Sequence, residues 1–111
     1  MAEVGCGSLK SLRDQLRALS KRHAMEIIST LVEGPRYISQ IAAEMGIPYT
    51  TAQQRVAELE RAGLIEVADS VDEASKRAVR KARLVNFRIE LSPRIIRQLV
   101  TGEGKKDFRV A

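Results

Sequence analysis

The sequence has few of the side chains from which most catalytic and metal sites are built. Its 111 residues include one cysteine, Cys6, one histidine, His23, and no tryptophan. A single cysteine excludes a disulfide within one chain and a metal cage made of several cysteines. We interpret His23 as structural, because one histidine cannot supply the several protein ligands of a metal site. We therefore expect no metal and no other cofactor.

Sequence motifs of catalysis, secretion and membrane insertion are missing as well. There is no glycine-rich loop to cradle a phosphate, and no set of Ser, His and Asp or of Cys and His for nucleophilic catalysis. No apolar run approaches about 18 residues, and residues 1–10 lack the hydrophobic segment of a secretory signal. We therefore expect a cytoplasmic protein that has no membrane segment and is not an enzyme.

The composition that remains is typical of one small, basic domain. The chain is 44% hydrophobic but only 4% aromatic, which favours an aliphatic, helix-rich core. Its net charge of +5 attracts polyanions, and nucleic acid is the leading candidate. We assign the domain to residues 9–100. The glycine-rich residues 1–8 and the polar residues 101–111 are predicted to be a flexible N-terminus and a flexible C-terminal tail.

Apolar periodicity predicts four helices before residue 63. A first helix carries a narrow leucine seam, and a second, at about 21–33, is capped by Ser20 and ends at Gly34-Pro35. After a short extended piece at 36–38, a third helix at about 39–45 and a fourth at about 49–62 flank a turn at Gly46. The fourth helix buries Ala52, Val56 and Leu59.

Alternating apolar residues then predict a hairpin, followed by a last helix. One strand covers Leu64–Asp69, and a second covers Leu84–Leu91, with Val85, Phe87, Ile89 and Leu91 facing the core. Ser92-Pro93 opens a helix that runs to about residue 100. Residues 70–83 are best interpreted as an extended hairpin tip. A partly helical segment is the alternative, because Ser70 to Glu73 fit a capping box.

Residues 40–65 resemble the helix-turn-helix of the ArsR-type winged-helix regulators of archaea and bacteria. The segment reads QIAAEMGIPYTTAQQRVAELERAGLI and matches without a gap. With the helices before it and the stretch from Phe87 to Pro93, the resemblance covers about residues 9–100. It implies an α+β, mostly helical fold: a winged helix-turn-helix with a two-stranded β-hairpin wing and dimerisation helices at both ends. MarR-like and other regulators share the turn spacing.

The resemblance places the fourth helix in the major groove of DNA. Its first half presents polar side chains able to reach base edges or flanking phosphates, namely Tyr49, Thr50, Thr51, Gln53 and Gln54. The wing, at about 70–83, is expected to contact phosphates through Lys76, Arg77, Arg80, Lys81 and Arg83. Between residues 72 and 88, six basic residues stand against two acidic ones, so most of the net charge is expected at the wing.

The first and last helices are the expected dimer interface. The seam residues are three, four and three positions apart, as in a coiled pair of helices. The seam can instead pack within its own domain, but so short a helix has little else to bury against, which favours a subunit interface. The expected interface residues are Leu9, Leu12, Leu16, Leu19, Ile95, Ile96 and Leu99.

The chain departs from the family at its metal sites. Where many members carry sensor cysteines, at the start of the third helix, this sequence has Tyr37, followed by Ile38 and Ser39. The last helix, residues 93–100, has no His, Asp or Glu for the second site of the family. The resemblance therefore implies a regulator that does not sense metal.

Together these features predict a homodimeric transcription regulator on a pseudo-palindromic site in double-stranded DNA, with repressor or activator action left open. The alternative is a winged-helix module that docks onto protein or RNA in a larger assembly. The operator and any effector are not specified by the residues.

Overall fold

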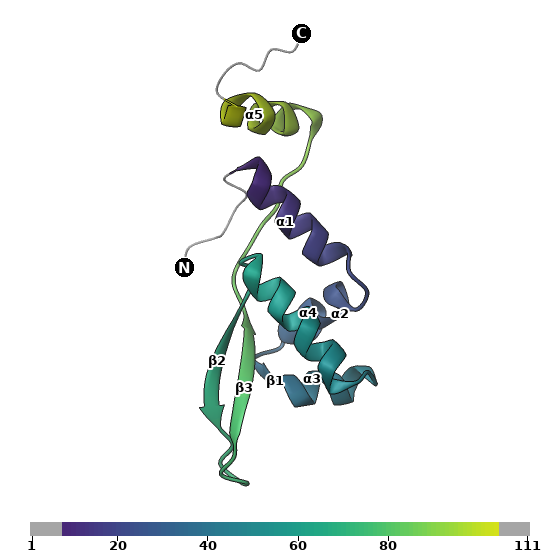
Figure 1. Cartoon of the computed structure of the whole chain (residues 1–111), viewed down its shortest axis with the longest axis vertical. Coiled ribbons are helices and arrows are strands. Elements are labelled where there is room, and N and C mark those ends of the chain that lie inside the picture. Colours follow the sequence, from purple (N-terminus) through teal and green to yellow (C-terminus); the bar gives the residue numbers. More distant parts are fainter. Residues whose placement is uncertain (1–7, 105–111) are drawn as a thin grey trace.

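The computed structural model describes residues 8–104, which form five helices and a three-stranded sheet (Figure 1). The four helices α1 to α4 lie together, the hairpin β2–β3 projects from them, and α5 lies at the opposite end of the molecule. The principal extents are 61 × 27 × 20 Å, and the radius of gyration is 16.9 Å. A compact domain of this length has a radius of about 13 Å, so the molecule is elongated.

The first two helices meet at a tight turn. Helix α1 spans Leu9–Ser20 and begins at Ser8, whose hydroxyl accepts a hydrogen bond from the backbone N–H of Ser11 at 3.0 Å. Helix α2 spans Ala24–Leu31. The predicted Ser20 cap of α2 is wrong, because Ser20 is the last residue of α1 and donates its hydroxyl to the carbonyl of Arg17. His23 precedes α2 in the left-handed region, at φ 76°, which His adopts more readily than most residues.

The predicted helix-turn-helix is confirmed. Helix α3 spans Ile38–Met45, and α4 spans Tyr49–Arg61. Gly46 ends α3 in the left-handed region, at φ 67°, and the next N–H, that of Ile47, donates to the carbonyl of Ala42. The three predicted core positions of α4 are fully buried: Ala52, Val56 and Leu59. Their i, i+4, i+7 spacing holds α4 against the core with its opposite face outward.

The sheet has the order β1-β3-β2, and both of its pairs are antiparallel. Strand β1 spans Arg36–Tyr37, β2 spans Ile65–Val71 and β3 spans Ala78–Leu84. The predicted second strand at 84–91 is therefore wrong, because β3 ends where it was expected to begin. The extended hairpin tip is confirmed over its alternative, since residues 70–83 continue both strands and turn at 72–77 without forming a helix.

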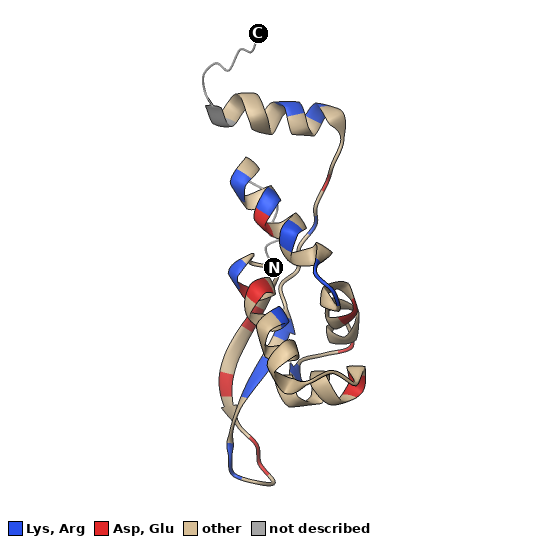
Figure 2. Ribbon diagram, turned by 45° about the vertical axis from the view of Figure 1, so that its right-hand side comes forward, with Lys and Arg blue, Asp and Glu red and all other residues tan. Residues whose placement is uncertain are grey.

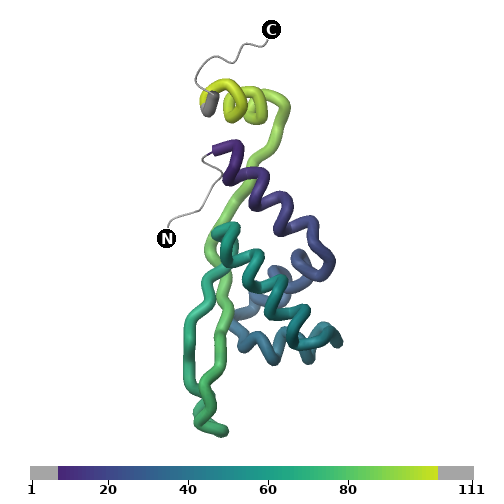
Figure 3. The backbone as a smooth tube through the Cα atoms, viewed as in Figure 1, coloured from purple at the N-terminus to yellow at the C-terminus, as the bar shows by residue number. Residues whose placement is uncertain are grey.

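Residues 85–92 connect the hairpin to α5 and run past α1 (Figure 3). Side-chain burial alternates there as predicted up to Ile89, with Val85, Phe87 and Ile89 half-buried and the intervening side chains exposed, but Leu91, which was also expected to face the core, is exposed. Phe87 packs against the core cluster. The alternation therefore reports which side chains face the protein, although the backbone is not part of a strand.

Helix α5 spans Pro93–Gly104, and the hydroxyl of Ser92 accepts a hydrogen bond from the N–H of Ile95 at 3.2 Å, as a cap does. The helix continues four residues beyond its predicted end. Its apolar residues are only partly covered within one chain: Ile96 is 43% exposed, and Ile95 and Leu99 are half-buried. The reason is the position of α5, which lies beyond α1 and away from the core (Figure 1). The remainder of both predicted tails lies outside the described residues.

Candidate nucleic-acid interface

The exposed face of α4 begins with uncharged polar side chains. Tyr49, Thr50, Gln53 and Gln54 are exposed, and Thr51 is half-buried beside the buried Ala52. None of the five carries a formal charge, so each can exchange water for a base edge without the large cost of stripping an ion of its hydration. Four of the five predicted base-contact residues therefore lie fully on the open face of α4.

The predicted phosphate-contact residues are exposed on the wing, but not all are free of partners. Arg80 lies 3.6 Å from the carboxylate of Asp69, and Arg83 pairs with Glu66. The ammonium of Lys81 lies 5.4 Å from the centre of the Tyr37 ring. Within residues 8–104, no described carboxylate pairs with Lys76 or Arg77. The unneutralised charge of the wing is therefore at its tip and at Lys81.

The wing is less basic than the sequence prediction implied. Figure 2 shows Lys and Arg along β3 and Asp and Glu on the facing strand β2. Residues 65–84 contain five basic and four acidic side chains. The prediction counted from residue 72 and so left out Glu66 and Asp69, which antiparallel pairing places opposite Arg83 and Arg80. By contrast, residues 9–22 of α1 and its turn contain five basic residues and one acidic residue.

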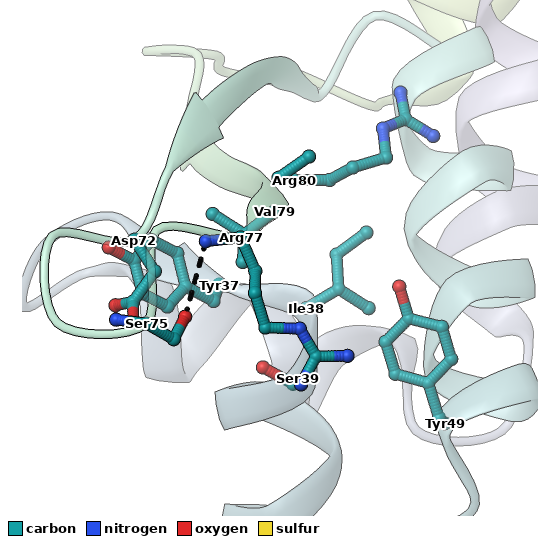
Figure 4. Close-up of a pocket in the computed structure, with 10 residues that line it drawn as sticks. Tyr37, Ile38, Ser39, Tyr49, Asp72, Ser75, Arg77, Val79 and Arg80 are labelled. Atoms are coloured by element: carbon teal, nitrogen blue, oxygen red, sulfur yellow. Dashed lines mark hydrogen bonds between the residues drawn. The ribbon is translucent and has the colours of Figure 1, made fainter.

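An open pocket of about 420 Å³ separates the wing tip from α4 (Figure 4). Its walls come from the start of α3, the start of α4 and the turn of the hairpin. At one end, the carboxylate of Asp72 accepts a hydrogen bond from the N–H of Ser75 at 2.9 Å. That bond, the Ser75 hydroxyl and the Tyr37 hydroxyl lower the pKa of Asp72 below its usual value, so its charged form is favoured. Asp72 thereby holds the hairpin turn.

Helix α4 is fixed to the rest of the domain by a residue that sequence reasoning missed. The Nε of Arg55 donates to the main-chain carbonyl of Arg22 at 2.9 Å, and its guanidinium lies 3.2 Å from the carboxylate of Glu58. Both side chains are more than four-fifths buried. The i, i+3 spacing of Arg55 and Glu58 was the available signal, but nothing in the sequence indicates the contact with Arg22.

The residues predicted for a dimer interface do not all lie on one exposed surface. Leu12 is 4% exposed and Leu16 is 42% exposed, while Leu9 and Leu19 are half-buried. Leu91 and Ile96 are each 43% exposed. Together with Leu16, they leave apolar area open on α1 and around α5. Beside Leu12, the amide of Gln15 is buried with its oxygen unpartnered.

The sequence predicts no metal-sensor site because of the residues at two positions, Tyr37 and His23, and the structure shows where both lie. Tyr37 lies directly before α3, with its ring against the wing, and His23 lies in the turn before α2. Among residues 8–104, no group of three or more His, Cys, Asp or Glu side chains could hold a metal ion. In the same part of the chain, no helix is both long and apolar enough to cross a membrane.

The comparison with protein families matches residues 19–68 to a helix-turn-helix domain. The chain contains a helix-turn-helix domain. Neighbours of known structure extend the likeness to most of the chain. One is the homodimeric winged helix-turn-helix DNA-binding domain of a possible ArsR-family transcriptional regulator from Mycobacterium bovis. It is 21% identical, with a TM-score of 0.58, over 86% of this chain and 77% of that one.

Two further neighbours extend the likeness. An ArsR family transcriptional regulator is 18% identical, with a TM-score of 0.57, over 84% of this chain and 90% of that one. The transcriptional repressor BigR from Xylella fastidiosa is 20% identical, with a TM-score of 0.55, over 88% of this chain and 91% of that one. No curated protein matches by sequence. The helix-turn-helix domain thus has the winged fold, and the resemblance to ArsR-type regulators is confirmed at the level of the fold.

Proposed function

We propose that this protein is a transcription regulator that binds double-stranded DNA in a sequence-specific manner as a homodimer. The observation that carries the proposal is the exposed polar face of α4, set beside a hairpin with unpaired cations at its tip. A helix of this size fits the major groove, and a neighbouring wing then meets the phosphates. The helix-turn-helix match and the winged fold support this assignment.

The dimer is supported by the molecule's shape and by one neighbour. Helix α5 lies beyond the core, and Leu16, Leu91 and Ile96 expose apolar area that a second copy can cover. The Mycobacterium bovis domain is homodimeric. A two-fold dimer places its recognition helices about 34 Å apart, which suits a pseudo-palindromic site with half-sites in successive major grooves. Because BigR is a repressor, we propose repression as the mode of regulation.

A selection experiment tests the proposal. The purified protein is incubated with fragmented genomic DNA, bound fragments are sequenced, and the enriched duplex is footprinted. We expect a protected site with two related halves and an affinity at least about a thousandfold above that for random duplex. For any variant that loses one positive charge from the proposed DNA surface, the matched control is Arg61→Met, because Arg61 is exposed at the far end of α4.

A different result identifies the alternative function. If the protein binds all duplexes weakly, without enrichment of any sequence, then it does not read DNA. A winged-helix module that docks onto protein or RNA then becomes the better assignment.

A further inference from the structure

The pocket between the wing and α4 joins three parts of the DNA-binding fold at one point. Ser39 comes from the start of α3, Tyr49 is the first residue of α4, and Arg77 comes from the tip of the hairpin. Ser39 and Arg77 are exposed, and 45% of Tyr49 is exposed. In Figure 4 the Arg77 side chain runs into the pocket, and its guanidinium ends between Ser39 and Tyr49. Ser39 and the ring of Tyr49, each of which carries a hydroxyl group, therefore flank a cation (Figure 4).

Arg77 differs from the other arginines of the wing. Arg80 and Arg83 lie against carboxylates of β2, whereas no described carboxylate lies within ion-pair distance of Arg77. The Asp72 carboxylate lies toward the other end of the pocket, beside Tyr37, and is held by Ser75 (Figure 4). The charge of Arg77 is thus free to meet an anion that enters from solvent.

Hydrogen bonds hold the backbone around Arg77 in its turn. The N–H of Asp72 donates to the carbonyl of Arg77 at 2.9 Å, and the N–H of Arg77 donates to the hydroxyl of Ser75 at 3.3 Å. Tyr37 pairs with Lys81 in the sheet and also lies under its ammonium. The hairpin is therefore braced against the start of α3 at Tyr37, at the base of the segment that carries Arg77.

We propose that this pocket is the seat of one DNA backbone phosphate, held by the Arg77 guanidinium and by the hydroxyl groups of Ser39 and Tyr49. The inference rests on the proposed function and deepens it. A planar guanidinium and hydroxyl donors suit a phosphate oxyanion. With α4 in the major groove, the strand that borders the groove passes between the helix and the wing, which is where the pocket opens. Tyr37 is a positioning residue, because it holds the wing and does not face the phosphate.

The test replaces a phosphate and an arginine in turn. The duplex is the one enriched in the selection above, prepared with a neutral methylphosphonate at one backbone position at a time. We expect one position per half-site at which neutralisation weakens the unmutated protein about tenfold. Arg77→Met should bind the unmodified duplex about tenfold more weakly and should no longer respond to methylphosphonate at that position. Because Arg77 is exposed in a turn, its removal should leave the melting temperature unchanged, which is checked first.

The matched control is Arg83→Met, which removes an arginine from the same wing but outside the pocket. This variant should keep the methylphosphonate response at the Arg77 position. Tyr37→Phe keeps the ring under Lys81 but loses the hydroxyl, and it should weaken binding less than Arg77→Met. Its response to the methylphosphonate should persist.

Three results separate the explanations. If Arg77→Met responds to every methylphosphonate as the unmutated protein does, the phosphate seat is wrong while the proposed function stands. If no duplex is enriched at all, the proposed function itself fails. Inorganic phosphate, added at constant ionic strength, tests for a free anion. Displacement of DNA from the unmutated protein but not from Arg77→Met, without any methylphosphonate effect, would assign the pocket to a free ion and overturn the inference.

Discussion

Arg55 lies on α4, the proposed recognition helix, but its side chain is more than four-fifths buried against the protein. Its bond to the carbonyl of Arg22 links α4 to the turn between α1 and α2, 33 residues away in the chain. The next residue in that turn is the left-handed His23. The bond to the Arg22 carbonyl therefore helps to fix an uncommon backbone conformation. This side chain therefore adds a polar link to the apolar packing that holds α4 against the other helices.

Arg55→Met should destabilise the domain, because it leaves the Arg22 carbonyl and the Glu58 carboxylate without this partner. We expect the free energy of unfolding to fall by about 1–3 kcal/mol. Urea denaturation at one fixed protein concentration measures the change. Arg61→Met, which removes an exposed arginine from the same helix, should cost less than about 0.5 kcal/mol. Equal stability of the two variants would show that the Arg22 contact is not significant.

Within α4, Gln53 and Gln54 are the exposed side chains best suited to adenine, because a carboxamide can bond its N6 and N7 together. We expect Gln54→Ala to weaken binding to the selected site by about 1–3 kcal/mol and to change binding to random duplex little. The slope of log affinity against log salt should stay nearly constant, since no charge is lost. Titration of both duplexes at several salt concentrations measures these quantities. An equal loss on both duplexes would place Gln54 away from the bases.

The accuracy of sequence prediction differed between elements for a physical reason. Helix α4 was predicted because Ala52, Val56 and Leu59 mark its buried face at helical spacing. Strand β3 was misplaced because only Ala82 is fully buried in it, and half of its other side chains are charged and exposed. The connection at 85–92 alternates more strongly, so the sequence pattern predicts a strand there instead. Alternation reports contact with the protein, whereas a strand requires backbone pairing with β1 and β2.

The site was predicted in part for a similar reason. The polar face of α4 follows directly from helical geometry once its core positions are known. The pairing of Arg80 with Asp69 and of Arg83 with Glu66 depends on hairpin register, which the misplaced strand had altered. Tyr37 was recognised by its position before α3, but its contact with the wing requires the β1–β3 pair. That pair joins Tyr37 to Lys81, 44 positions later, and no sequence pattern indicates it.

At the scale of the assembled molecule, the exposed apolar side chains give a prediction about the dimer. Leu16→Glu combined with Ile96→Glu should produce a folded monomer, because both side chains are more than 40% exposed in one chain and charges there oppose only subunit contact. Leu12 is unsuitable for this test, since it is buried within its own chain. Sedimentation velocity gives the mass, and circular dichroism checks that the helices remain.

The expected loss of the dimer has a functional readout. The monomeric variant should bind a half-site about as weakly as the full site, whereas the unmutated dimer should prefer the full site strongly. The matched control is Arg13→Glu, an exposed change on α1 that introduces the same residue. A monomeric unmutated protein at tens of micromolar would contradict the proposed assembly.

The short strand β1 determines how the wing can move. It pairs with β3 only at Lys81 and Ala82, near the base of the hairpin, and Ala82 is completely buried there. The base of the wing therefore opens only when the helical core opens with it, as one cooperative unit. Beyond Lys81, the backbones of β2 and β3 pair only with each other, so this part can bend more easily than the base, with the Tyr37 hydroxyl at Asp72 as a side-chain brace. Any adaptation of the wing to the varying width of a DNA groove is thereby confined to residues 69–80, with the β1–β3 pair as its hinge.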